Sequence, residues 1–148
     1  MQAVIAQLEE LVQANARRLQ AIAEEDFAQK LTQEHWSKKE ILGHLVDSAQ
    51  NNIQRFVRAG YENRPHVVYD QDVWVAAQGY QNYPTAALIM LWQLLNKHIC
   101  TVLNNMPADI YSRLCDTGRD EETLYTVEFL AKDYIVHLVH HLKQIFNT

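Results

Sequence analysis

Apolar residues recur with the 3.6-residue period of a helix along four long segments of the chain. These segments run from about Ala3 to Glu24, Lys38 to Ala59, Pro84 or Thr85 to Asn104, and Val127 to Phe146. Few β-branched runs with strict alternation occur, so we expect little or no sheet. The pattern therefore predicts an all-α protein that is built on four long helices.

Local sequence signals mark where several of these helices begin and end. Ser37 and Glu40 form a capping box, in which each side chain can bond the backbone amide of the other residue. Gly60 is suited to end the helix that follows them, and Pro84 suits the first turn of the next helix. Thr126 is placed to cap the last helix. These signals support the boundaries that the apolar period predicts.

Two of the connections between the predicted helices are long, residues 60–83 and residues 106–125. Loops of this length inside a compact domain are more often functional or locally helical than idle. A chain of 148 residues is long enough for one domain with a substantial core, but not for two. We therefore predict one domain over residues 1–148, folded as a four-helix bundle.

Composition and charge narrow the classes of function. The formal net charge is −5, and no run of Lys and Arg exceeds two residues. Binding to nucleic acid or anionic lipid requires clustered basic residues, so we expect no nucleic-acid and no membrane partner. The N-terminus lacks the basic region of a signal peptide, and no apolar run approaches the roughly 20 residues of a membrane span. We interpret the isolated Cys100 and Cys115 as reduced thiols of a cytoplasmic protein.

The histidines are the strongest candidates for chemistry. His137 and His141 lie four residues apart on the predicted fourth helix, so they share one face of it, at the edge of the apolar stripe. His140 falls on the other side of His137, toward Lys143, and should face water. On the second predicted helix, His44 also lies at the boundary between core and solvent. Two imidazoles from one helix and a third from another would make the three-ligand set of a catalytic metal site.

Helical phase alone leaves this interpretation open. It cannot show that His44 lies near the fourth helix, and a histidine at a helix boundary is usually a hydrogen-bonding residue of the core edge. A pair of histidines one turn apart is also commoner than metal sites are. The other histidines are weaker candidates, because they follow a turn, lie in a loop or lack a helical histidine partner: His35, His66 and His98.

Two motifs resemble those of a known family. The first, Trp-Ser-x-x-Glu-x-x-x-His-Leu-x-Asp-Ser, begins at Trp36, and the second, His-x-x-x-His followed by Gln144 and Ile145, begins at His137. In this order and spacing they resemble the DinB-like (DinB/YfiT-like) superfamily, and the resemblance covers nearly the whole chain. It implies a four-helix bundle with two long crossover connections. It also implies that a divalent metal ion, most often zinc or nickel, is bound by His44, His137 and His141.

The resemblance implies several activities. Relatives include thiol-dependent S-transferases that use bacillithiol or mycothiol, a mycothiol-dependent maleylpyruvate isomerase, and hydrolases. Our leading hypothesis is a metal-dependent enzyme that activates either a low-molecular-weight thiol for attack on a small electrophile or water for hydrolysis. The alternative is a non-catalytic dimeric helical binding module with a vestigial or structural metal site. Relatives often dimerise, so we expect a homodimer that acts on a small-molecule substrate.

Residues around the predicted ligands have two interpretations each. Asp47 and Asp133 lie one turn from His44 and His137, where a carboxylate can orient a metal-bound imidazole. A solvated helix face is the commoner role for such a residue. Four aromatic residues of the first long connection can line a substrate mouth or simply pack the connection onto the bundle: Tyr61, Trp74, Tyr80 and Tyr83.

Overall fold

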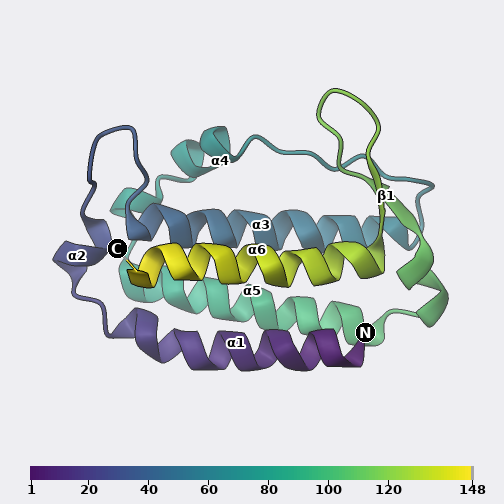
Figure 1. The fold of residues 1–148 in the computed structure, drawn as a ribbon, viewed down its shortest axis with the longest axis horizontal. Coiled ribbons are helices and arrows are strands. Elements are labelled where there is room, and N and C mark those ends of the chain that lie inside the picture. The colour runs from purple at the N-terminus through teal and green to yellow at the C-terminus, as the bar shows by residue number, and fades with distance from the viewer. Residues whose placement is uncertain (148) are drawn as a thin grey trace.

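The protein is represented by a computed structural model, which describes residues 1–147. Its four long helices are α1 (Gln2–Gln20), α3 (Lys38–Ala59), α5 (Thr85–Asn105) and α6 (Val127–Asn147). Helix α3 packs against α5 and α6, and α1 packs against the same two helices, so the order around the bundle is α1, α5, α3, α6 (Figure 1). The predicted all-α four-helix bundle is confirmed. The predicted domain end at residue 148 lies outside the described residues.

The directions of the helices explain the first long connection. Helices α3 and α5 run in the same direction, whereas α1 and α6 run in the opposite one (Figure 1). The chain must therefore return along the length of α3 before α5 can begin, and residues 60–84 make this crossover. The crossover contains α4 (Gln71–Gln78) and the short 3-10 helix η1 (Tyr80–Asn82). It is therefore locally helical, one of the two expectations for a loop of this length.

The remaining elements close the two ends of the bundle. Helix α2 (Glu24–Ala28) lies at the end where α3 begins and α6 finishes (Figure 1). At the other end, the 3-10 helix η2 (Ala108–Ser112) leads into a hairpin of β1 (Leu114–Asp116) and β2 (Leu124–Thr126). The two strands pair antiparallel, with Cys115 opposite Tyr125. Two three-residue strands within the described residues agree with the expectation of little sheet.

The predicted capping signals are confirmed at two helix starts. At α3 the side chain of Ser37 accepts a hydrogen bond from the amide of Glu40, and the Glu40 carboxylate accepts one from the amide of Ser37 at 2.8 Å. At α6 the hydroxyl oxygen of Thr126 accepts from the amide of Phe129 at 3.1 Å. These contacts satisfy amides that have no partner within the first turn of a helix.

One predicted helix end is wrong. Helix α1 ends at Gln20, whereas the apolar pattern extended it to about Glu24. The backbone of Ala23 is extended, with φ −62° and ψ 144°, and this bend starts α2. The turn places the ring of Phe27 in the core, where it is fully buried. Phe27, an apolar residue that follows Gln20, is therefore buried by tertiary packing of the next element, and not because α1 continues.

Helix α5 is long and apolar, although polar residues interrupt its apolar run. Its 21 residues contain a window with a mean hydropathy of 1.4, which is enough to cross a membrane by length and composition alone. In the bundle, however, α5 packs against α1 and α3 and buries Leu88, Trp92 and Ile99. It also buries Asn96, whose Oδ1 accepts a hydrogen bond from the hydroxyl of Tyr134 on α6 at 2.7 Å. Helix α5 is thus a core helix of the bundle.

Candidate metal centre

Three histidines from two helices converge at one end of the bundle. Helices α3 and α6 are antiparallel neighbours, so the first turns of α3 lie beside the last turns of α6 (Figure 1). His137 Nε2 lies 3.1 Å from His44 Nε2 and 3.1 Å from His141 Nε2. The ligand atoms of all three residues lie within 4.8 Å of one another. The fold therefore supplies the proximity of His44 to α6 that helical phase could not predict.

The spacing of these nitrogen atoms fits a divalent metal ion. Imidazole nitrogens that bind one zinc ion tetrahedrally at about 2.05 Å lie roughly 3.3 Å apart. The observed 3.1 Å separations are close to this value. Three protein ligands on one side of an ion leave a position open for another molecule, which is the arrangement of a catalytic rather than a structural site.

The surroundings keep the three imidazoles neutral. Burial, followed by the positive charges that His137 and His141 would carry, lowers the pKa of His44 from 6.5 to about 3. Burial and the neighbouring charge of His141 lower the pKa of His137 to about 4. Burial also lowers the pKa of His141, although its bond to Gln144 opposes this effect. At pH 7 the histidines therefore hold unprotonated nitrogens, which metal binding requires.

Neighbouring side chains orient two of the three rings. The Nδ1 atom of His141 donates to Oε1 of Gln144 at 2.7 Å. Because this amide oxygen only accepts, the proton of His141 resides on Nδ1, and the lone pair of Nε2 is available to the ion. The Nδ1 atom of His137 lies 3.5 Å from the hydroxyl of Ser48. Ser48 and Gln144 both lie in the motifs that carry the family resemblance, but their contacts with the imidazoles were not predicted.

The remaining histidines stand outside the cluster. His140 is exposed, and its Nε2 contacts Gln144 Nε2 at 3.1 Å, so it lies on the solvent side as helical phase predicted. His35 contacts Thr32 in the loop before α3, and His66 contacts the backbone of the β1–β2 hairpin loop. The ring of His44 itself packs against Trp36, with 5.1 Å between the ring centres.

Asp47 differs from its expected position on a solvated helix face. Its side chain is fully buried, and its Oδ1 accepts hydrogen bonds from the hydroxyl of Tyr80 at 2.6 Å and from Nε2 of Gln78 at 3.1 Å. Burial raises the pKa of Asp47 to about 6, against the two hydrogen bonds, which lower it. Asp133, the equivalent residue beside His137, is exposed as expected. The donors to Asp47 come from α4 and η1, so this carboxylate ties the crossover to α3.

Tyr80 also explains a glycine in the middle of α3. A Cβ atom at Gly43 would overlap the ring of Tyr80, so only glycine lets this ring lie against the helix. Beside it, Gln81 accepts from the hydroxyl of Ser37 at 2.6 Å and donates to the carbonyl of Ala28 at 2.7 Å. A glycine in the interior of a predicted helix indicates that another group lies close to the helix, so the sequence contained a signal for this contact.

The aromatic residues of the crossover do not form one mouth. Tyr80 is buried beneath the crossover and points its hydroxyl at Asp47. Tyr61 is 70% exposed and follows the far end of α3, away from the histidines. Of the two interpretations, a place in a mouth beside the histidines therefore does not apply to Tyr61. Trp74 packs against Tyr69 of the crossover, with ring centres 5.6 Å apart. Packing of the connection onto the bundle is the better description for Tyr80.

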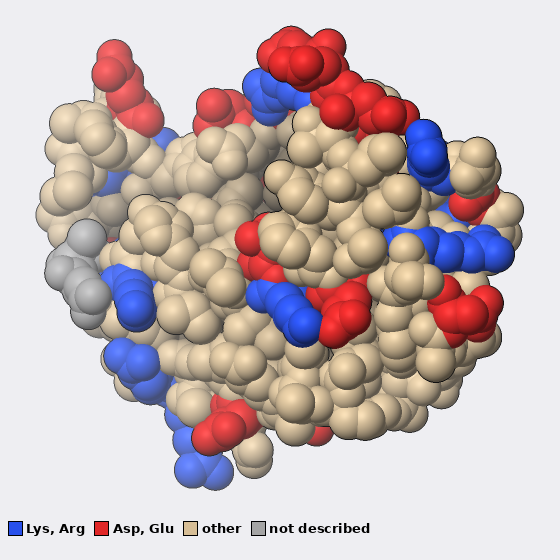
Figure 2. All heavy atoms as spheres, turned by 45° about the vertical axis from the view of Figure 1, so that its right-hand side comes forward, with Lys and Arg blue, Asp and Glu red and all other residues tan. Residues whose placement is uncertain are grey.

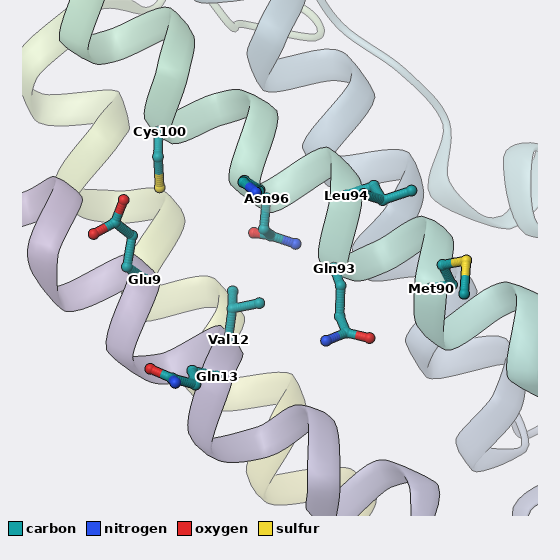
Figure 3. A pocket seen from close by; sticks show the side chains of 9 residues that line it. Glu9, Val12, Gln13, Met90, Gln93, Leu94, Asn96 and Cys100 are labelled. Atoms are coloured by element: carbon teal, nitrogen blue, oxygen red, sulfur yellow. The ribbon is translucent and has the colours of Figure 1, made fainter.

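A separate cavity of about 570 Å³ lies between α1 and α5 (Figure 3). Its walls come from helices other than the two that carry the histidines. On the face drawn in Figure 2, Lys and Arg side chains are mixed with Asp and Glu over most of the surface, and basic side chains follow one another only along the lower left edge. The cavity lining consists of Glu9, Val12, Gln13, Met90, Gln93, Leu94, Asn96, Lys97 and Cys100.

Comparisons with known proteins place these features in context. A model of the DinB superfamily matches residues 7–145. The structure is similar to YfiT from Bacillus subtilis, which is described as a probable metal-dependent hydrolase with an unusual four-helix bundle topology. The TM-score is 0.87 at 22% identity, over 99% of this chain and 83% of YfiT. No curated protein matches the chain.

Two structures of the mycothiol-dependent maleylpyruvate isomerase, one of them a mutant, are also similar. Their TM-scores are 0.81 and 0.74, at 10% and 12% identity. The matches cover 98% and 95% of this chain but only 60% and 59% of the isomerase chains. At these identities the structural likeness shows a common fold.

Proposed function

The chain belongs to the DinB superfamily, and from this premise we propose that it is a metal-dependent enzyme. The divalent ion, zinc or nickel, would be held by His44, His137 and His141. The observation that supports this proposal is the convergence of three imidazole nitrogens within 4.8 Å of one another, two of whose separations are 3.1 Å. A divalent ion with an open position supplies an acidified thiol or water molecule at neutral pH.

The chain's own residues would prepare this centre. His44 is buried against Trp36, which shields one side of the cluster from water. Gln144 and Ser48 fix the rings of His141 and His137 from behind. Three neutral ligands add no negative charge, so the centre favours an anionic fourth ligand such as a thiolate or hydroxide.

The two cysteines of the described chain bear on the source of the attacking group. Cys100 and Cys115 are both buried, and burial raises the pKa of Cys100 to about 11 and also raises that of Cys115. Neither can serve as a nucleophile at neutral pH. The attacking group would therefore come from outside the chain. We infer thiol S-transferase-type activity on small electrophiles, with metal-dependent hydrolysis as the other branch.

A second candidate is a non-catalytic dimeric helical module with a vestigial or structural metal site. The exposed apolar side chains of Met90 and Leu94 on α5 favour it, because they are 61% and 57% exposed beside the cavity of Figure 3. In either case we propose a cytoplasmic homodimer. We propose a small molecule as its ligand, and neither nucleic acid nor membrane as a partner.

Metal analysis of the purified protein tests the first candidate. After dialysis against zinc or nickel, the wild type should retain about one equivalent of metal per chain. His137→Ala should abolish this uptake. His140→Ala should not, because His140 lies three residues further along α6 on the solvent side. A wild-type protein that holds less than about a tenth of an equivalent would rule out the metal centre.

The reaction class is tested on the metal-loaded protein. A halogenated aromatic electrophile is assayed with and without a low-molecular-weight thiol, and an ester is assayed in parallel. Thiol-dependent turnover of the electrophile supports the transferase branch. Turnover of the ester that ignores the thiol supports the hydrolase branch. A protein that binds metal but turns over neither substrate class points to the non-catalytic module.

A further inference from the structure

Two buried polar atoms on α3 lack a hydrogen-bond partner within the described residues. They are Nδ1 of His44 and Oδ2 of Asp47. The two side chains are 1% and 0% exposed, so bulk water does not satisfy either atom. A buried polar group without a partner destabilises the folded state. The two atoms belong to residues that lie three apart on the same helix.

The two atoms are complementary in chemistry. Nε2 of His44 points at the other two histidines, and its lone pair must be free to bind an ion, so Nδ1 carries the proton and is a donor. Oδ1 of Asp47 already accepts from Tyr80 and Gln78, whereas Oδ2 is an acceptor with no donor. Residues three apart on a helix lie on neighbouring parts of one face.

The other two ligands show the same arrangement in completed form. Nδ1 of His141 donates to the amide oxygen of Gln144 at 2.7 Å, and Nδ1 of His137 lies 3.5 Å from the hydroxyl of Ser48. His44 is the member of the cluster whose rear nitrogen has no such oxygen. Metal-binding histidines almost always donate this second N–H to an oxygen atom, which fixes the ring and its tautomer.

We propose that Asp47 is the positioning residue of His44. Nδ1–H of His44 donates to Oδ2 of Asp47, directly or through one buried water molecule, and this bond directs the lone pair of Nε2 toward the ion. The inference rests on the proposed function only in naming a metal ion as what Nε2 binds. The proposed role of Asp47 also involves the crossover, because Oδ1 of the same carboxylate accepts hydrogen bonds from Tyr80 and Gln78. The docking of the crossover on α3 is thereby linked to the orientation of a metal ligand.

An Asp47→Asn substitution tests this role by reversing one hydrogen bond. The amide oxygen can keep the bonds from Tyr80 and Gln78, and the amide NH₂ then faces His44 in place of Oδ2. Nδ1 must become the acceptor, so the proton moves to Nε2 and blocks the ligand atom. In the metal-free protein, ¹⁵N NMR should show His44 protonated on Nδ1 in the wild type and mainly on Nε2 in the variant.

Metal affinity is the second readout. Asp47→Asn should weaken cobalt or zinc binding by about 10–100-fold, the usual effect of removing such a partner. Asp133→Asn is the matched control, because it removes a carboxylate one turn from His137 that is exposed; it should stay within about threefold of the wild type. Tyr80→Phe keeps the ring against Gly43 and removes only the hydroxyl. It therefore removes the hydrogen bond from Tyr80 to Asp47 without changing the bond between Asp47 and His44. It should retain the wild-type tautomer.

The outcomes are distinguishable from those of the proposed function. If the wild type binds no metal, the proposed function fails, and the tautomer comparison still decides whether Asp47 positions His44. An unchanged His44 tautomer in Asp47→Asn would overturn the inference. Equal losses of affinity in Asp47→Asn and Asp133→Asn would overturn it as well, because the effect would then be one of general charge. Urea unfolding of the metal-free variants identifies any loss that comes from misfolding.

Discussion

Two grooves of this bundle invite comparison, the α3–α6 groove that holds the histidines and the α1–α5 groove that holds the cavity of Figure 3. Both lie between antiparallel neighbouring helices. In the α3–α6 groove, Nε2 of His137 lies 3.1 Å from Nε2 of both His44 and His141, and the rings of His137 and His141 each have an oxygen atom near Nδ1. In the α1–α5 groove, polar side chains such as Gln13 and Gln93 are spread along apolar walls (Figure 3).

Open volume and a set of converging donor atoms are separate properties of this bundle. The α1–α5 cavity offers about 570 Å³ but no set of donor atoms that meet at a point. The α3–α6 groove offers a set of three histidine ligand atoms that lie within 4.8 Å of one another. Binding energy at a metal centre comes from a few directional bonds, whereas an apolar cavity contributes through area. Substitutions in the α3–α6 groove should therefore change metal affinity, whereas those in the α1–α5 groove should leave it unchanged.

The largest contrast is expected from loss of a ligand. His141→Ala should lower metal affinity at least about 100-fold, since even outer partners of a ligand are worth 10–100-fold. Gln93→Ala in the α1–α5 cavity should leave affinity unchanged. Competition with a chromophoric chelator measures both. Equal affinity in the two variants would place the metal centre elsewhere.

Acidification should give the next largest effect, a loss of folding stability that comes from the buried histidines. The pKa values of His44 and His137 are lowered to about 3 and 4. The stability that their neutral forms contribute is therefore fully present above pH 6.5 and is lost as the pH falls toward those values. Asp47, with its pKa raised to about 6, acts in the opposite sense and offsets part of the loss. The metal-free protein should lose about 2 kcal/mol of unfolding free energy between pH 7 and pH 5.

Urea unfolding at several pH values measures this dependence. A His44→Gln variant removes one of the titrating groups and should flatten the curve. A wild-type curve that is already flat between pH 7 and pH 5 would show that the histidines do not remain neutral in the folded protein.

A methyl group at Gly43, where the crossover lies against α3, should give a smaller effect. Alanine favours a helix over glycine by about 1 kcal/mol, but the added Cβ would overlap the ring of Tyr80. Overpacking of this kind costs about 1–3 kcal/mol, so Gly43→Ala should destabilise the protein. In a Tyr80→Ala background the same change should be neutral or stabilising. A double-mutant cycle by thermal unfolding checks this sign reversal, and additive effects would contradict it.

The smallest effect is expected in the α1–α5 groove. Leu94 is 57% exposed, so Leu94→Ser should change unfolding free energy by no more than about 0.5 kcal/mol. Metal content should stay at the wild-type level. Sedimentation analysis of the same variant tests the alternative function: a dimer that dissociates on this change would identify the groove as an interface. An unchanged oligomeric state would restrict function to the histidine groove.

Much of this arrangement was predictable from the sequence, and the exceptions have physical causes. The apolar period and capping box located α3 from Lys38 to Ala59, because both signals are local. Phase on α6 separated His140 from its neighbours for the same reason. The contact of His44 with α6 depends on the order and direction of the helices, so only the family resemblance supplied it. The burial of Asp47 escaped prediction because its partners lie on the crossover, about 30 residues away.

The separation of 93 residues between His44 and His137 has a consequence for synthesis of the protein. Helix α3 leaves the ribosome well before α6, so a nascent chain carries only the first of the three ligands. Closing so long a loop is slow compared with forming a helix. The cluster is therefore assembled only when the last helix docks, and capture of the proposed ion would mark the end of folding rather than its nucleation.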